Sequence, residues 1–453
     1  MRTVLKNFHV VDEEIDMPNG NVIIENGIIT DLLPCSAFSR RQEECAAVVI
    51  DGSSLSEGAA PVLMPAFVDL HAHFRDPGFP DKETLESASL SAVAGGFCTV
   101  ICMANTKPVI DTIEKAARIK KRADTVGLVD LYPVISLTRG MEGRELSEIS
   151  AIAPKSAPAI GAYVPLMLSE DGKDLADDVL FLEAMNEAKR IGIPISCHCD
   201  FGGEEAEAAK KSGQGRSVWS RIEENNAVHR VIALGKKAGC HIHIAHVSTK
   251  EAVQAIAAAK AERQPNSNSG FVLTCEVMPH NLCLTEETAQ KLGEESWGRV
   301  NPSLRHEQDR KALVKAVMDG TIDAIATDHA PHSNADKEAG APGFSAFETA
   351  FAAAFTELAK SVNGSVPVID LMRLSSLLSA SPAKLAGLSG HGGRGRILPG
   401  MMADLVIVDT EHSQIVDPER FKTRGKNSPF MGMELFGKVL LTLRGGRVVF
   451  ASQ

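Results

Sequence analysis

Residues 66–78 read Ala-Phe-Val-Asp-Leu-His-Ala-His-Phe-Arg-Asp-Pro-Gly and decide how the middle of the chain is interpreted. The run 66–71 is typical of a strand buried on both faces, and polar side chains follow where it ends. Seven similar apolar runs follow, most of them separated by helical segments such as 113–125 and 177–191, and they are 98–103, 129–135, 160–165, 195–198, 241–246, 271–276 and 322–327. This alternation predicts an α/β fold with a (β/α)8 TIM barrel over residues 66–395. A doubly wound open sheet is the alternative that the pattern leaves open.

The two ends of the chain show a different pattern. Short alternating runs broken by Gly-containing turns are typical of antiparallel strands, and they lie at 3–11, 20–25, 28–33, 48–51, 403–408, 438–444 and 447–451. Neither end has enough strands for a stable sheet of its own. We therefore expect residues 1–65 and 396–453 to build one small β-sandwich-like domain.

Composition excludes several classes of protein. The 453 residues include 47 basic and 58 acidic side chains, a net charge of −11 without a long basic run, which argues against nonspecific nucleic-acid binding. No apolar run approaches the ~20 residues that cross a bilayer, and the first residues lack the apolar core of a signal peptide. The nine cysteines are odd in number and several lie in apolar runs, which predicts reduced thiols in a cytoplasmic protein. A structural zinc cluster is disfavoured, because Cys98 with Cys102 and Cys197 with Cys199 have no second pair.

Imidazoles and carboxylates recur where the candidate strands end. His71 and His73 are two residues apart, so both side chains point to one side of an extended strand. The carboxyl ends of barrel strands converge on one face, where catalytic residues gather. Four histidines and two aspartates at these ends offer enough N and O donors for two first-row metal ions, and they are His71, His73, Asp171, His198, His246 and Asp328.

Such a site predicts metal-assisted hydrolysis. Two ions ~3.5–4 Å apart can share a water and lower its pKa toward ~7, and this water can attack a carbonyl. A carboxylate must take the proton of the water and return it to the leaving nitrogen; Asp328 is the best candidate, and Asp171 is the best bridging ligand. The alternatives are that Asp171 only caps a helix, and that His198 and His246 are ordinary core histidines.

Several motifs together resemble the dihydroorotases of the amidohydrolase superfamily. They are DLHAHFRDPG at 69–78, MANTKP at 103–108, NPSLR at 301–305, DHAPH at 328–332 and the return GRI…ADLVIVD at 395–409. The resemblance implies a barrel enzyme that interconverts dihydroorotate and N-carbamoyl-aspartate in pyrimidine biosynthesis. It also implies zinc, one or two ions per chain with two favoured, and a homodimer, with aspartate transcarbamoylase as a further candidate partner.

The resemblance also assigns roles to residues. It implies that the six donors are the metal ligands, with Asp328 as proton shuttle, and that substrate contacts come from His73, Arg75, Asn105, Asn301, His332, Pro342 and Gly343. A guanidinium suits the substrate carboxylate, which it can grip through two bonds. The alternatives are a surface ion pair of Arg75 with Asp76 or Asp81 and a turn role for Asn105.

Many superfamily members bridge their metals with a carboxylated lysine on strand four. The run 160–170 contains no lysine, so the chain resembles the branch in which an aspartate, here Asp171, takes that place; Lys173 is the first lysine after the run. Three stretches depart from the usual family pattern: Met278–Asn281, Asn301–Ser303 and Ala341–Phe344. In the last of these, only Gly343 of the Pro342–Gly343 pair keeps a backbone donor.

Two other functions stay open. An allantoinase or hydantoinase would use the same metals, but a hydantoin without a carboxylate gives Arg75 nothing to neutralise. A noncatalytic relative that acts as a scaffold beside aspartate transcarbamoylase would typically have lost metal ligands, whereas every expected ligand type is present here.

Overall fold

The computed structural model describes residues 1–39, 43, 46–55, 60–155, 163–262, 270–361 and 366–452. Parallel strands occupy the middle of the chain, and they are β6 (Phe67–Ala72), β7 (Phe97–Cys102), β8 (Asp130–Pro133), β9 (Leu168–Ser169), β10 (Ile195–Cys197), β11 (His241–Ile244), β12 (Val272–Val277) and β13 (Ala324–Ile325). They pair in the orders β6-β7-β8 and β9-β10-β11-β12-β13. Parallel bridges from Ile135 to Leu168 and from Ala72 to His329 join the two ladders at both ends. The ring therefore closes as a (β/α)8 barrel, and the open sheet is excluded.

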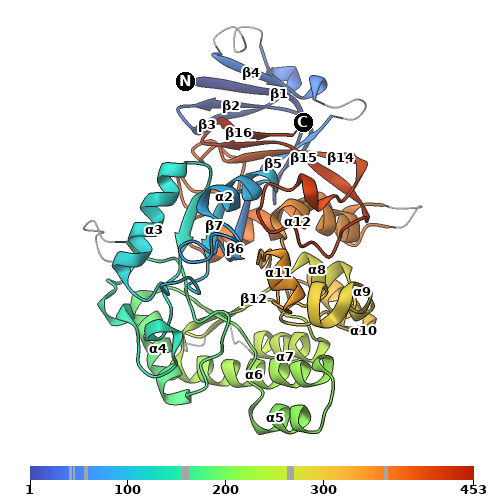
Figure 1. Ribbon diagram of the computed structural model, residues 1–453. Coiled ribbons are helices and arrows are strands. Elements are labelled where there is room, and N and C mark those ends of the chain that lie inside the picture. The colour runs from blue at the N-terminus through green and yellow to red at the C-terminus, as the bar shows by residue number, and fades with distance from the viewer. Residues whose placement is uncertain are drawn as a thin grey trace.

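Helices between the strands cover the outside of the barrel (Figure 1). The longer ones are α2 (Leu85–Ala94), α3 (Ile113–Val126), α4 (Asp178–Ile191), α5 (Gly203–Lys211), α6 (Arg216–Ala238), α7 (Lys250–Ala261), α10 (Glu307–Asp319) and α12 (Phe347–Ala354). Local sequence sets their ends: the side chains of Thr112 and Asp177 accept backbone N–H bonds in the first turns of α3 and α4. Gly127 and Gly192 end the same helices in left-handed conformations. Both helices lie within one residue of their predicted bounds.

Shorter helices lie mainly in the second half of the chain, and they are α8 (Pro279–Cys283), α9 (Glu286–Leu292), α11 (Asn334–Glu338), α13 (Leu371–Ser375) and α14 (Ser381–Leu385). None of the helices in the described residues is long and apolar enough to cross a membrane. The eight cysteines that the structure describes are free thiols, while Cys45 lies outside the described residues.

The fourth strand lies later than predicted. Residues 160–162 of the predicted strand lie outside the described residues, and 163–165 form no strand. Instead β9 pairs Leu168 with Ile195 and Ser169 with Ser196. Strand β13 is equally short but lies within its predicted run 322–327, so of the two shortest strands only β9 is misplaced. The shift places Asp171 two residues beyond the strand, at the carboxyl end of the barrel.

Both termini contribute to one mixed sheet, which lies at one end of the molecule (Figure 1). Its strands are β1 (Arg2–Val11), β2 (Asp16–Glu25), β3 (Ile28–Pro34), β4 (Val48–Asp51), β5 (Val62–Pro65), β14 (Leu405–Ile415), β15 (Glu434–Arg444) and β16 (Arg447–Ala451). The sandwich-like, antiparallel prediction is corrected, because β1 pairs in parallel with β4 and β5 and the sheet is a single layer in the order β16-β15-β14-β5-β1-β2-β3.

The terminal sheet packs against the barrel and not against a second sheet. Val62, Met64 and Val406 pack into the same core as Phe67 and Phe97 of the barrel strands. A separate core covers the rest of the sheet and includes Leu5, Phe8, Val22, Leu63, Ile397 and Leu405. The sheet therefore buries its apolar side chains partly against the barrel, and the predicted domain boundary at residues 65/66 falls between β5 and β6.

Candidate metal centre

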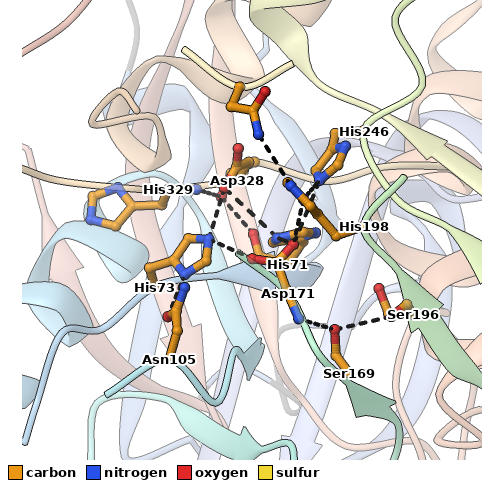
Figure 2. A network of polar contacts seen from close by, with 12 residues as sticks. His71, His73, Asn105, Ser169, Asp171, Ser196, His198, His246, Asp328 and His329 are labelled. Carbon is orange, nitrogen blue, oxygen red and sulfur yellow. Dashed lines mark hydrogen bonds and ion pairs between the residues drawn. The ribbon is translucent and has the colours of Figure 1, made fainter. Parts of the chain in front are cut away.

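The six predicted metal ligands converge at the carboxyl ends of the barrel strands (Figure 2). Each side chain lies at the end of a different strand or just beyond it, except that His71 and His73 share β6. All six are buried, with exposed fractions between 0% and 7%. Residues up to 257 positions apart in the sequence thus share one enclosed site.

Asp171 lies at the centre of the cluster, as Figure 2 shows. Its Oδ1 atom lies 3.2 Å from His71 Nε2, 3.2 Å from His198 Nδ1 and 3.5 Å from His246 Nε2. Its Oδ2 atom lies 3.3 Å from His73 Nε2. One carboxylate therefore faces four imidazoles, which is the arrangement expected of a ligand that bridges two ions.

Asp328 faces the other side of the same cluster. Its Oδ1 atom lies 3.0 Å from His73 Nε2 and 3.8 Å from His71 Nε2. Two overlapping groups of donors are spaced closely enough to hold a cation, namely His71, Asp171 and His246, and His71, His73 and Asp328. The geometry is consistent with a binuclear centre.

Unsatisfied polar atoms support a cation at this place. His71 Nε2 and Asp171 Oδ1 are buried and have no hydrogen-bond partner of acceptable geometry within the described residues. Buried polar atoms normally find a partner, so each unpartnered one needs an explanation. The nitrogens His198 Nδ1 and His246 Nε2 also approach each other to 2.7 Å. Imidazole nitrogens and carboxylate oxygens that face one point fit a first-row divalent ion.

Further side chains hold the imidazoles in place. His71 Nδ1 lies 3.0 Å from Glu276 Oε1, His73 Nδ1 lies 2.9 Å from Asn105 Oδ1, and His198 Nε2 lies 2.9 Å from Asp200 Oδ2. An acceptor on one ring nitrogen fixes the proton there and leaves the other nitrogen free to bind metal. Sequence reasoning did not identify Glu276 or Asp200, although Glu276 lies near the end of the predicted seventh strand.

Glu276 also contacts His243, whose Nε2 atom lies 3.0 Å from Glu276 Oε2. His243 and His241 were predicted to be structural, and both contact Thr274 Oγ1 at 2.9 Å on β12. His243 therefore supports the ligand shell through Glu276 and is not itself in the cluster.

The cluster keeps its carboxylates ionised. Burial raises the pKa of Asp171, but the neighbouring His71 and His198 outweigh it and hold this pKa well below its usual range. Burial is likewise outweighed at Glu276, where His243 and His71 lower the pKa to about 2. Both carboxylates are therefore negatively charged at neutral pH and can balance a cation.

Backbone strain also marks the site. His246 and Asp328 have φ angles of 35° and 44°, and Arg75 has a φ of 56°. Residues with side chains rarely adopt this left-handed region, and such outliers cluster at functional sites. The turn at each strand end therefore directs its side chain into the cluster at some cost in stability.

An arginine and a neutral histidine lie beside the metal cluster. Arg75 Nη2 lies 3.3 Å from His332 Nε2, and Arg75 Nε donates to the carbonyl of Pro331 at 3.4 Å. The predicted alternative partner Asp76 pairs instead with Arg122, at 2.7 Å. Arg75 is therefore not held by that carboxylate and is available for an anionic ligand.

The remaining predicted substrate residues are placed differently from one another. Asn301 Nδ2 lies 3.1 Å from His198 Nε2, close to the cluster. The carbonyl of Pro342 lies 2.8 Å from His332 Nε2. The N–H of Gly343 donates to the carbonyl of Arg299 at 3.1 Å, so the one backbone donor expected of this pair already has an acceptor. Lys173 donates to the carbonyl of Met141 at 3.1 Å and does not take the place of Asp171.

Comparison with known proteins identifies the family. The amidohydrolase family matches residues 62–449. Dihydroorotases from Clostridium botulinum and from a Thermoanaerobacter species are 35% and 34% identical, over 99% of this chain and 100% and 97% of their own lengths. The chain belongs to the dihydroorotases of the amidohydrolase family.

An L-hydantoinase from Arthrobacter aurescens has a similar structure, with a TM-score of 0.79 and 25% identity over 98% of this chain and 95% of its own. A dihydropyrimidinase from Brevibacillus agri, with a TM-score of 0.80 and 20% identity over 100% and 95%, shares the fold.

One stretch that departs from the dihydroorotase pattern, Met278–Asn281, includes His280, which lies near enough to Asp328 and His246 to sense their charges. Asn281 is 3% exposed and has no hydrogen-bond partner for either amide atom within the described residues. Its neighbour His280 is buried with its Nε2 atom unpartnered, and burial lowers the pKa of His280 to about 4. The ring of His280 packs edge-on against Phe344, with ring centroids 5.5 Å apart. In this dihydroorotase-like amidohydrolase, the side chains of His280 and Asn281 are thus both neutral at physiological pH.

Proposed function

We propose that the chain is an active dihydroorotase. It would catalyse the reversible hydrolysis of the cyclic amide of (S)-dihydroorotate to N-carbamoyl-L-aspartate in de novo pyrimidine biosynthesis. The observation that carries the proposal is that Asp171 contacts four imidazoles beside Asp328, with Arg75 close by and in no ion pair with a carboxylate of the described residues. This combination supplies both a metal centre for hydrolysis and a group for an acidic substrate.

The proposed ligands are His71, His73, Asp171, His198, His246 and Asp328, and the proposed metal is zinc, two ions per chain. Bound divalent ions would acidify a water molecule and polarise the amide carbonyl of the ring. Asp171 and Glu276 supply negative charge that balances these cations. Asn105 and Asp200 keep His73 and His198 oriented.

Asp328 is the proposed proton shuttle. Its carboxylate, beside His73 and His71, is ionised, because these imidazoles lower its pKa more than burial raises it. It takes the proton that the attacking water loses as the new C–O bond forms. It then gives this proton to the ring nitrogen as the C–N bond breaks, so the nitrogen leaves as a neutral group. In the direction of ring closure, the same carboxyl group returns the proton to water.

Arg75, Asn105, Asn301 and His332 are the proposed contacts of the substrate carboxylate and ring, with Pro342 and Gly343 as backbone contacts. Arg75 supplies the charge. His332 is neutral, because burial and the neighbouring Arg75 and Lys82 lower its pKa to about 2. A neutral imidazole can exchange hydrogen bonds with the ring without adding further positive charge to the site.

A substrate panel tests the proposal. Zinc-loaded protein is assayed with dihydroorotate, allantoin and dihydrouracil under identical conditions. We expect dihydroorotate to be strongly preferred in kcat/KM, because only it offers Arg75 a carboxylate next to the cyclic amide. Preference for either of the other two would assign the chain to the hydantoinase-type activities of the structurally similar enzymes. A folded protein that binds no metal would instead indicate a noncatalytic scaffold.

The homodimer, an association with aspartate transcarbamoylase and a cytoplasmic location stay predictions. Light scattering of the purified chain, alone and mixed with aspartate transcarbamoylase, measures the first two directly. A mass of one chain for the protein alone would contradict the homodimer. A mixture without any species heavier than the two separate proteins would contradict the association.

A further inference from the structure

Lys337 is a buried lysine for which sequence reasoning proposes no role. It lies on α11, which follows the DHAPH segment, and its side chain is 0% exposed. Burying an ammonium group is costly unless it is paired or fully hydrogen-bonded. Among the residues that the structure describes, no carboxylate forms an ion pair with it. Its position therefore requires another explanation.

Three backbone carbonyls accept hydrogen bonds from the three N–H groups of this ammonium group. Lys337 Nζ donates to Arg299 at 2.8 Å, to Ala341 at 3.0 Å and to Gly343 at 3.0 Å. An ammonium group has three donors, so each is used. The Nζ atom also lies 5.1 Å from the centre of the Phe344 ring, within range of a cation–π contact.

These carbonyls belong to two loops that are separate in the sequence. Arg299 precedes Asn301, whose amide lies 3.1 Å from His198. Ala341 and Gly343 flank Pro342, whose carbonyl lies 2.8 Å from His332. Both loops therefore carry a residue at the proposed substrate site.

The two loops also contact each other at the same point. The carbonyl of Arg299 accepts from both Lys337 Nζ and the N–H of Gly343. The carbonyl of Gly343 accepts from Lys337 Nζ and, at 2.8 Å, from Asn427 Nδ2, while Asn427 Oδ1 accepts from the N–H of His332 at 3.1 Å. The hydrogen bonds of a single ammonium group thus reach Gly343 directly and His332 through Asn427, and its contact with Arg299 lies two residues before Asn301.

We propose that Lys337 is a positioning residue that ties the loop 299–301 to the loop 341–343 and so holds the substrate contacts in register. Its role in catalysis rests on the proposed dihydroorotase function. Lys337 does not touch substrate or metal; it acts by fixing Asn301, Pro342 and Gly343.

The test compares Lys337→Met with wild type. Methionine keeps the length and the apolar stem but has no donor. Misplacing substrate contacts by about 1 Å costs up to about 100-fold, so we expect kcat/KM for dihydroorotate to fall about 10- to 100-fold, mostly through KM, with metal content unchanged. Hydrogen exchange of the metal-loaded, substrate-free protein should rise at 299–303 and 341–345 and stay unchanged at 246–249.

A matched control separates positioning from general stability. Lys260→Met removes another lysine that donates to a backbone carbonyl, that of Thr321 at 2.7 Å, and that also pairs with Asp323 at 2.6 Å, at the opposite end of the barrel. It should leave KM and the exchange of both loops at wild-type values. Should Lys337→Met fail to fold, Lys337→Gln is measured in the same way.

Two results would overturn the proposal. One is a Lys337 variant whose KM stays within twofold of wild type; the other is a raised KM without faster exchange in both loops. The exchange measurement needs no substrate. Loss of the dihydroorotase proposal would therefore appear as an inactive wild type, whereas failure of this inference would appear as unchanged exchange in the variant.

Discussion

Replacing Asp328 with asparagine separates proton transfer from metal binding. The amide keeps the size of the side chain and one oxygen, but it cannot accept the proton that the attacking water loses. Asp171 contacts four imidazoles, whereas Asp328 contacts two, at 3.0 and 3.8 Å. Most of the metal-binding contacts therefore stay intact in Asp328→Asn.

The expected loss of kcat follows from the proposed role of Asp328 in proton transfer. General acid–base catalysis contributes about 10²- to 10⁴-fold to a rate. Its loss raises the activation free energy by about 3–5 kcal/mol, since each factor of ten is about 1.4 kcal/mol. We expect kcat for dihydroorotate to fall by this factor, with the loss equal in kcat and kcat/KM, because the contact is used in the transition state.

The assay measures turnover and metal content on the same samples. Asp81→Asn, a substitution of an exposed aspartate on the loop after β6, is the control and should match wild type. An Asp328→Asn protein that carries the wild-type amount of metal and keeps kcat within threefold would refute the proton-shuttle assignment. Loss of all metal would refute the argument that Asp171 dominates binding.

Three further perturbations have defined outcomes. Arg75→Met should raise KM for dihydroorotate about 10- to 100-fold in steady-state assays, because a hydrogen bond to a charged group is worth about 1.5–3 kcal/mol. Glu276→Gln should weaken metal binding about 10- to 100-fold in chelator competition, since it replaces the charged acceptor of His71 Nδ1 with a neutral one. Burial raises the pKa of Glu348 to about 7. Between the unfolded value of 4.5 and this pKa, the folded chain holds a proton that the unfolded chain lacks, so stability falls as pH rises. Wild type should therefore lose stability relative to Glu348→Gln from pH 5 to 7, by less than about 1.4 kcal/mol per pH unit in denaturant titrations.

Each of these has a contradicting result. An unchanged KM in Arg75→Met would remove the guanidinium from substrate binding. Equal chelator resistance in Glu276→Gln and in the exposed control Glu204→Gln would show that His71 needs no negative charge beside its Nδ1 atom. A stability difference between wild type and Glu348→Gln that does not vary with pH would show that Glu348 is ionised in the folded chain at pH 5.

The sequence predicts the barrel because most of its strands are long enough to show a pattern. The runs 66–71 and 98–103 differ from β6 and β7 by one residue at each end. The two residues of β9 are recognised as a strand only through their pairing with β10. The parallel pairing of β1 with β5 joins segments about 50 residues apart and has no local signature.

The site likewise contains residues that a local sequence pattern predicts and residues that no local pattern reveals. His71 and His73 are predicted because their spacing is visible within one strand, and Asp328 because it follows another. Glu276 is a single carboxylate whose role depends on His71 from a different strand, and Asp200 lies two residues after His198, a spacing that by itself does not indicate a contact. The role of Lys337 is harder to predict from the sequence, since its partners are backbone carbonyls, which every residue has.

The most direct test of the account is stepwise metal loading of the metal-free protein, with bound zinc and dihydroorotate hydrolysis measured at each step. We predict no turnover without metal and activity that rises until two ions are bound per chain. A folded protein that hydrolyses dihydroorotate at full rate without metal, or that binds two ions and leaves dihydroorotate intact, would contradict the account.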